Sequence, residues 1–176
     1  DIDGEAASDN SGYSVSLSSD GSTVAIGAVG YMNYSGIVRI YKNIQGSWVS
    51  VFSVIGQSNT NSNWPGSWSG HSVSLSSDGN TVAIGANDNS ASSGHVRIYE
   101  NIGGSWNQKG SDIDGEAAYD NSGSSVSLSS DGNTVAIGAR FNNGNGHNSG
   151  HVRIYENISG AWSQIGQDID GEAAGD

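Results

Sequence analysis

An acidic segment that occurs three times carries most of the side chains able to bind a metal ion. Its sequence is Asp-Ile-Asp-Gly-Glu-Ala-Ala-x-Asp, at residues 1–9, 112–120 and 168–176, and with four acids per copy it holds twelve of the 18 acidic residues. The carboxylates stand at positions 1, 3, 5 and 9, which is the early ligand spacing of a calcium loop. The candidate ligands for calcium, the one cofactor that the sequence suggests, are Asp1, Asp3, Glu5, Asp9, Asp112, Asp114, Glu116, Asp120, Asp168, Asp170, Glu172 and Asp176.

The segment matches a calcium loop only in part. Position 6 is Ala where such a loop has Gly, and position 12 is Gly, at Gly12 and Gly123, where such a loop has Glu. The segment therefore also suits a solvated connector between repeats, or a surface that contacts a protein or a sugar. Four acids in nine residues repel one another, so a bound cation would ease the ordering of the segment.

Two tryptophans outside the repeated pattern could bind a partner. Trp64 and Trp68 flank Pro65 in residues 58–69, a stretch without acids that takes the place of the acidic segment before the second repeat. Exposed aromatic rings of this kind stack on sugars or anchor a protein partner. The alternative is local packing.

Glycosylation and anion binding are the other site chemistries that the sequence allows. Asn33 and Asn157 each begin an Asn-x-Ser sequon in a predicted loop, so they are candidate glycosylation sites. Arg39, Arg97 and Arg153 recur at one position of the repeat. We expect them to form structural ion pairs or bonds to loop carbonyls, with anion binding as the alternative.

No residue pattern indicates catalysis. His95 and His151 occupy a position that Ile37 fills in the first repeat, so the repeat does not need a histidine there. The sequence has no Cys, no histidine pair at a zinc-helix spacing, no nucleophile elbow and no phosphate-binding Gly-Lys loop. We therefore expect the protein not to be an enzyme.

Charge and composition exclude several classes of partner. The 176 residues have a net charge of −12 with only six Lys and Arg, so the chain would repel nucleic acid and anionic lipid. Its apolar runs are far shorter than the roughly 20 residues that span a bilayer, so we expect no membrane insertion. The chain begins without Met or a basic and apolar leader. We interpret this as removal of a signal peptide or as a piece of a longer chain.

Three nearly identical repeats indicate the fold. Each contains Ser-Val-Ser-Leu-Ser-Ser-Asp-Gly (residues 14–21, 72–79 and 125–132), then Thr-Val-Ala-Ile-Gly-Ala, a variable loop, Val-Arg-Ile-Tyr and a Trp. These are four short strands of period two, joined by Gly- and Asn-rich turns. We predict an all-β fold, a β-propeller-type array of three four-stranded antiparallel blades that further blades or oligomerisation would complete. A solenoid is the alternative.

The predicted organisation is one blade per repeat. Blade 1 with its leading acidic segment covers residues 1–57, blade 2 residues 58–111 and blade 3 residues 112–167, and residues 168–176 start a further repeat or form a docking tail. In an up-and-down blade the acidic segments share one end with the variable loops, where function usually concentrates. These loops are residues 29–36, 87–94 and 140–150. Three blades do not close a ring, which suggests a fragment, a ring of two chains or an open array.

The repeat resembles a known family. The series Ser-Gly-x-Ser-Val-Ser-Leu-Ser-Ser-Asp-Gly-x-Thr-Val-Ala-Ile-Gly-Ala, followed by Gly-x-Val-Arg-Ile-Tyr, is similar to the FG-GAP repeat of integrin-α-type β-propellers. The resemblance implies an extracellular or cell-surface propeller for adhesion or ligand binding, often with calcium between the first two strands of a blade. There each copy here has one acid, at Asp20, Asp78 or Asp131, and we interpret Ser-Ser-Asp-Gly mainly as a hairpin turn.

The sequence therefore predicts a nonenzymatic extracellular protein that serves adhesion or structural assembly, as a component of a surface or a filament. Its partners would be other copies of itself, neighbouring repeats of a longer chain, a carbohydrate or a surface protein. The alternative is a lectin-like or calcium-dependent ligand-binding propeller domain. Large polymers in solution would favour assembly, whereas a closed monomer or dimer that binds glycans would favour the lectin.

Overall fold

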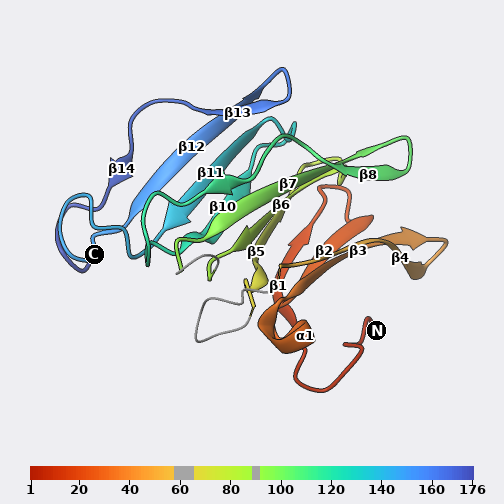
Figure 1. Cartoon of the computed structure of the whole chain (residues 1–176). Coiled ribbons are helices and arrows are strands. Elements are labelled where there is room, and N and C mark those ends of the chain that lie inside the picture. The colour runs from red at the N-terminus through yellow and green to blue at the C-terminus, as the bar shows by residue number, and fades with distance from the viewer. Residues whose placement is uncertain (58–65, 89–91) are drawn as a thin grey trace.

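The computed structural model consists almost entirely of β-sheet (Figure 1). It describes residues 1–57, 66–88 and 92–176, so Trp64 and Pro65 lie outside the described residues. Three antiparallel sheets, each with four strands in chain order, follow one another along the chain. The predicted array of three four-stranded blades is confirmed.

Each blade is an up-and-down sheet with the same register between its central strands. The pairs Val24–Tyr41, Val82–Tyr99 and Val135–Tyr155 are equivalent. The strands are β1 (Ser11–Leu17), β2 (Thr23–Ala28), β3 (Ile37–Ile44) and β4 (Ser47–Ile55) in blade 1; β5 (Ser69–Leu75), β6 (Thr81–Ala86), β7 (His95–Ile102) and β8 (Ser105–Gln108) in blade 2; and β10 (Ser122–Leu128), β11 (Thr134–Ala139), β12 (His151–Ile158) and β13 (Ala161–Gln164) in blade 3.

The outer edges of the blades contain a feature that the sequence pattern does not indicate. In blade 1, β4 pairs with β3 along its whole length. In the other blades the fourth strand is short, and a two-residue strand, β9 (Ile113–Asp114) or β14 (Ile169–Asp170), continues the pairing with β7 or β12. These strands satisfy backbone groups that the short fourth strand leaves unpaired. The start of each later acidic segment thus belongs by pairing to the blade before it.

The apolar cores lie between neighbouring blades. The core between blades 1 and 2 contains Ala25, Val38, Ile40, Val73, Leu75, Val82 and Ile84. The core between blades 2 and 3 contains Ala83, Val96, Ile98, Ile113, Val135 and Ile137. Trp106 and Trp162 pack against these cores, whereas Trp48 at the equivalent place in blade 1 is 37% exposed.

Serines of the first strands bond to the following blade. Ser14 Oγ donates to the Gly70 carbonyl at 2.6 Å, and Ser72 Oγ donates to the Gly123 carbonyl at 2.8 Å. Their small side chains let the sheets approach closely enough for these bonds. The alternation of Ser with Val and Leu therefore serves contacts between blades.

The Ser-Ser-Asp-Gly sequence forms a hairpin turn, as predicted. Asp20 Oδ1 accepts hydrogen bonds from Ser18 Oγ (2.7 Å) and Ser22 N (2.9 Å). These bonds lower the pKa of Asp20 to about 2, with the Ser18 hydroxyl making the largest contribution. Asp78 and Asp131 make the same bonds in the other blades. The acid at the family's calcium position therefore closes the turn.

The two sequons lie in different surroundings. Asn33 is exposed in the four-residue segment α1 (Tyr31–Tyr34), a tight turn in which Met32, Asn33 and Tyr34 have left-handed backbone conformations. Among the described residues no helix is long and apolar enough to cross a membrane. Asn157 lies in strand β12 and not in a loop, because β12 continues its pairing with β13 through Asn157 and Trp162. Its Oδ1 accepts from Gly160 N at 3.0 Å, and its Nδ2, the atom that would carry a glycan, is buried. The loop prediction for Asn157 was wrong.

Candidate functional site

The acidic segments and the variable loops meet at one end of the array, as strand parity predicts. Backbone hydrogen bonds join Gly30 N to Asp9 O (3.0 Å), Phe141 N to Asp120 O (3.3 Å) and Gly175 N to His147 O (3.0 Å). Helix α1 and the C-terminus lie toward this end in Figure 1. We call this surface the loop end; it comprises residues 1–9, 29–36, 66–68, 87–88, 92–94, 115–121, 140–150 and 171–176.

Arginines of the third strands bind carboxylates of the acidic segments. Arg97 donates from Nε (2.9 Å) and Nη2 (2.7 Å) to Asp112 Oδ2, and Gln108 donates to Asp112 Oδ1 at 2.7 Å. The Arg97 guanidinium is the main cause that holds the pKa of Asp112 below its ordinary value. The structural ion pair expected for the recurring arginine is therefore present in blade 2.

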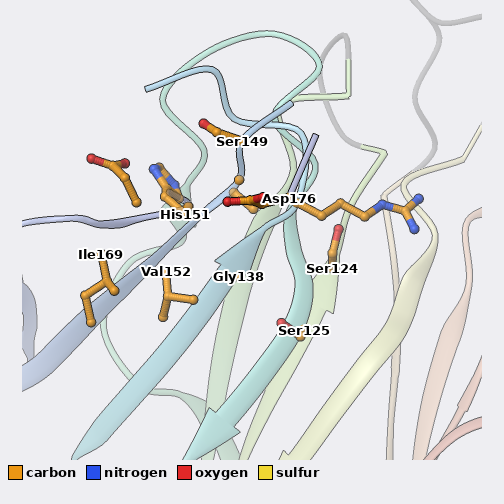
Figure 2. A pocket seen from close by; sticks show the side chains of 13 residues that line it. Ser124, Ser125, Gly138, Ser149, His151, Val152, Ile169 and Asp176 are labelled. Carbon is orange, nitrogen blue, oxygen red and sulfur yellow. The ribbon is translucent and has the colours of Figure 1, made fainter. Parts of the chain in front are cut away.

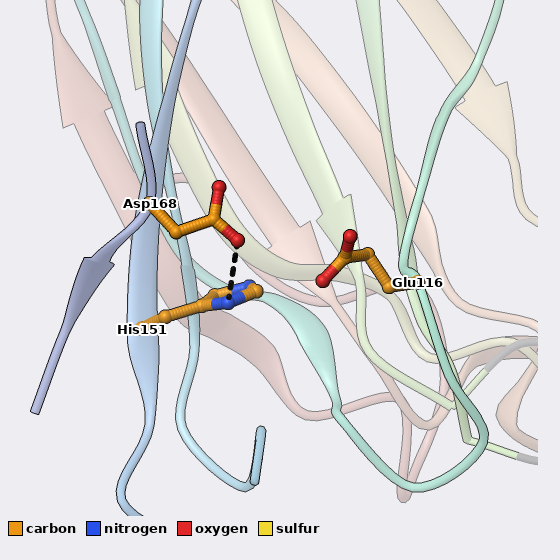
Figure 3. A group of neighbouring side chains, drawn as sticks. All are labelled: Glu116, His151 and Asp168. Carbon is orange, nitrogen blue, oxygen red and sulfur yellow. Dashed lines mark ion pairs between the residues drawn. The ribbon is translucent and has the colours of Figure 1, made fainter. Parts of the chain in front are cut away.

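Arg153 joins two copies of the acidic segment. Its Nη2 pairs with Glu116, from the segment before blade 3, and with Asp168 Oδ2 (2.9 Å), from the segment after it. Figure 3 shows both carboxylates beside His151, whose Nδ1 is 3.6 Å from Asp168 Oδ2. In blade 1, Arg39 pairs with Glu5 at 2.6 Å. Glu5 and Glu116 thus tie the first two acidic segments to the blade that follows each of them. Asp112 and Asp168 tie the second and third segments to the blade before each of them.

Glu116, His151 and Asp168 form a group of three ligand-type side chains, and no other such group was found among the described residues. They come from two acidic segments and a strand, whereas the calcium-loop spacing would gather the acids of one segment. The Arg153 guanidinium already supplies a positive charge here, and calcium takes six to eight oxygen ligands in preference to an imidazole. The group does not fit a calcium ion.

The remaining acidic candidates are spread along the loop end and the short edge strands β9 and β14. Asp120 is 1% exposed and accepts hydrogen bonds from Asn142 Nδ2 (3.0 Å) and Ala117 N (3.1 Å). Asp176 closes the same turn with Ala173 N at 2.7 Å, and Asp9 is buried. Asp176 is exposed, as are Glu5 and Glu116 described above. The other exposed candidates are Asp1, Asp3, Asp114, Asp170 and Glu172. Calcium binding by a single segment stays a prediction.

Trp68 lines a pocket between the variable loops of blades 2 and 3. Its ring stacks on Tyr34 with the ring centroids 5.6 Å apart. The other lining residues are Asn87, Asp88, Ser92, Asn121 and Arg140. Asn121 Nδ2 donates to the carbonyls of Asn87 (2.9 Å) and Ser92 (3.1 Å), which fixes the wall of the pocket. Partner contact by Trp68 stays a prediction.

The sequence pattern did not indicate three exposed apolar side chains at the loop end. Tyr119 is 69% exposed, Met32 62% and Phe141 39%. Tyr119 stands at the variable position of the acidic motif, where the other copies have Ser8 and Gly175. Met32 and Phe141 stand in the variable loops. A position-by-position comparison of the three copies could have found them, because apolar residues are expected to be sparse in solvated loops.

The fold is similar to those of solved structures. The crystal structure of Saccharomyces cerevisiae Sqt1 aligns with a TM-score of 0.57 and 13% identity, over 95% of this chain and 38% of that chain. A candidate 6-phosphogluconolactonase from Bacteroides uniformis aligns with a TM-score of 0.45 and 15% identity, over 90% of this chain and 56% of that chain. This chain therefore spans less than two thirds of either protein. The likeness to Sqt1 concerns the fold alone.

The sequence comparison identifies the repeat. No curated protein matches the chain. Residues 111–155, which include β10, β11 and most of β12, match the FG-GAP repeat. The two earlier copies have nearly the same strand sequences and the same strand register. Residues 111–155 thus contain an FG-GAP-type repeat, and the two earlier copies resemble it in strand sequence and register.

Proposed function

We propose that this protein is a nonenzymatic, extracellular adhesion module that contacts a partner through its loop end. The FG-GAP repeat supports a propeller-type domain. The observation that carries the proposal is the exposure of Tyr119, Met32 and Phe141 on segments that differ between three otherwise matching blades. Divergence on a constant scaffold is typical of surfaces that bind a partner.

Hydrogen bonds hold this surface in one arrangement. Asn142 Nδ2 donates to the buried Asp120 carboxylate (3.0 Å), and Asn145 Nδ2 donates to the carbonyls of Gly171 (2.9 Å) and Glu172 (3.1 Å). Loops ordered before binding lose less conformational entropy when a partner docks. The loop end can therefore present its apolar side chains at a low entropic cost.

Charge indicates the kind of partner. The loop end carries exposed acids, among them Asp3 and Glu172, on a chain of net charge −12. An acidic surface attracts a basic one and repels other acidic surfaces. The partner that fits is a protein surface with Lys or Arg around an apolar patch.

Adhesion of coated beads to intact cells of the source organism tests the proposal. Beads that carry the wild-type chain should adhere, and the double substitution of Tyr119→Ala with Phe141→Ala should abolish most of the adhesion without lowering the melting temperature. Ile102→Ala is the matched control, because Ile102 is 65% exposed at the end of β7, beside the turn to β8 at the opposite end of the array. Wild-type beads that fail to adhere, or equal losses in the double variant and the control, would overturn the proposal.

A lectin-like function is the second candidate, and the Trp68 pocket favours it. An aromatic ring beside Asn87, Asp88, Asn121 and Arg140 offers both stacking and hydrogen bonding, which sugars require. On a glycan array, wild-type protein would then bind defined glycans and Trp68→Ala would not. An array without signal, alongside adhering beads, would leave the protein partner as the explanation.

A further inference from the structure

The face of blade 1 that points away from blade 2 exposes apolar side chains that are buried in the next blade. Val15 is 64% exposed and Leu17 59%. Their equivalents in β5, Val73 and Leu75, are 9% and 7% exposed, because blade 1 packs on them. We call the open face of blade 1 the head face. It presents one half of a core of the kind found between blades.

The opposite face of blade 3 exposes the other half. Val152 is 37% exposed and Ile169 57%, whereas Val96 and Ile113 at the equivalent places of blade 2 are 0% and 5% exposed. Figure 2 shows a hollow on this face, with Ser125, Gly138, Val152 and Ile169 among its lining residues. We call it the tail face. The hollow lies where the following blade sits in the other two repeats.

The hydrogen-bonding groups of the two end faces also match. Inside the array, Leu75 N donates to Ser16 Oγ and Leu128 N donates to Ser74 Oγ, both at 2.9 Å. Leu17 on the head face is equivalent to Leu75 and Leu128, and Ser127 on the tail face is equivalent to Ser16 and Ser74. Leu17 N and Ser127 Oγ are therefore the donor and acceptor of the same bond at the two open faces. In the same way, Ser125 on the tail face is equivalent to the donors Ser14 and Ser72. Gly12 on the head face is equivalent to the acceptors Gly70 and Gly123.

Glycines make the approach of the next blade sterically possible. A Cβ on Gly27 or Gly85 would overlap the carbonyl of Gly70 or Gly123 in the following blade. A Cβ on Gly138 would meet only the side chain and carbonyl of Ser125 in its own blade. Gly138 therefore has the close-approach geometry of the two internal joints, on a face that is open.

We propose that the tail face docks the head face of a second copy of this chain. The joint continues the two interfaces inside the chain, with Val15 and Leu17 against Val152 and Ile169, Ser125 Oγ donating to Gly12 O, and Leu17 N donating to Ser127 Oγ. No third protein is needed, because each copy carries both halves of the joint. The lining of the hollow includes the loop-end residues Arg140 and Asp176. Tyr119 and Phe141, which the adhesion test changes, do not line it, so the two proposals are tested with different residues.

The acidic segments give the joint an electrostatic component. Glu116 pairs with Arg153 across the joint between blades 2 and 3. The equivalent residues at a joint between copies are Glu172 of one copy and Arg39 of the next, where Glu5 is already paired. Glu172 and Glu5 therefore compete for one arginine. Because the competing segments are both acidic, salt should strengthen the association by screening their repulsion.

Head-to-tail docking has a specific signature in mixtures of variants. Val15→Glu places a charge on the head face and leaves the tail face intact, and Val152→Glu does the reverse. Each variant alone should sediment as the 18.0 kDa monomer, whereas wild-type protein should form larger species as its concentration rises. An equimolar mixture of the two variants should form a dimer and nothing larger, because one intact head face meets one intact tail face.

Controls separate docking from unspecific effects. Ile102→Glu adds the same charge at a 65% exposed position of blade 2 away from both end faces, and it should associate as the wild type does. Ile169→Glu replaces Val152→Glu if the latter melts at a lower temperature than the wild type. Sedimentation velocity at low and high salt gives the readout. A wild-type chain that is monomeric at all concentrations, or a mixture that stays monomeric, would overturn the proposal.

Discussion

Blade 2 is packed on both faces, whereas blades 1 and 3 are each packed on one. The second strand of every blade has the sequence Thr-Val-Ala-Ile-Gly-Ala, and in β6 all six residues are buried. In β2 the half-buried residues are Val24 and Ile26, and in β11 they are Thr134 and Ala136. These two sets lie on opposite faces of the strand. One sequence thus has three patterns of burial, and the neighbouring blades decide which one occurs.

We infer from this comparison that stability depends on the joints between blades more than on the single blades. Side chains of adjacent blades form each core, so a blade without its neighbour loses half a core on that side. In arrays of this kind stability is approximately a sum of repeat and nearest-neighbour terms. Equivalent substitutions in the middle and at the ends should then have unequal effects, which makes the comparison testable.

The largest difference is expected between Ile98→Ala and Ile154→Ala. Ile98 is fully buried in the core between blades 2 and 3, while Ile154 occupies the same position of the half-buried tail face. Ile98→Ala should lower the free energy of unfolding by about 4 kcal/mol, and Ile154→Ala by about 2 kcal/mol or less. Urea denaturation measures both. Equal losses would show that the end blade has a complete core of its own.

The stability of the protein should also depend on pH through His95, because the packing of blade 2 buries this side chain. Burial is the main cause that lowers the pKa of His95 to about 4, and Arg97 adds to it. The unfolded chain then takes up a proton before the folded chain does. Stability is retained above pH 6.5 and is lost as the pH falls towards 4, by about 3 kcal/mol.

His95→Ile should remove this part of the pH dependence, because Ile37 already occupies the equivalent, buried position of blade 1. Unfolding free energies of the two proteins, measured in urea between pH 7 and pH 4, provide the comparison. Asp112, which faces His95, has a pKa held below its ordinary value by Arg97 and therefore titrates mostly below this range. Parallel pH profiles would mean that His95 is not buried in the neutral form.

The sequence was sufficient to predict the strands and their order. Ser-Val-Ser-Leu and Thr-Val-Ala-Ile alternate with period two between clear turn signals, and the near-verbatim repeats define three sheets of equal register. Strand parity also placed the acidic segments beside the variable loops. These features depend on local pattern and connectivity, which a sequence contains.

The partners of individual side chains could not be predicted, because they depend on contacts between blades. Nothing in the Asp-Ile-Asp spacing shows that Asp112 binds Arg97, that Glu116 binds Arg153, or that Ile113 extends the sheet of blade 2. A segment that binds calcium and a segment that joins two blades through ion pairs can have the same acids at the same spacing. The recurrence of one arginine per blade was the available signal, and it indicated the ion pair without naming its acids.

The smallest expected effect concerns one hydrogen bond. It separates the contribution of a contact between blades from the contribution of the strand itself. Ser74 Oγ accepts from Leu128 N across the joint between blades 2 and 3, while Ser127, at the same place in blade 3, is exposed. Ser74→Ala leaves a partly buried N–H without its acceptor and should cost about 1 kcal/mol of unfolding free energy, whereas Ser127→Ala should cost nothing measurable. Both are measured in urea in the Val15→Glu background, which prevents a second copy from covering Ser127. A loss at Ser127 as large as that at Ser74 would mean that these serines stabilise their own strands, and that neighbouring blades do not set their contribution.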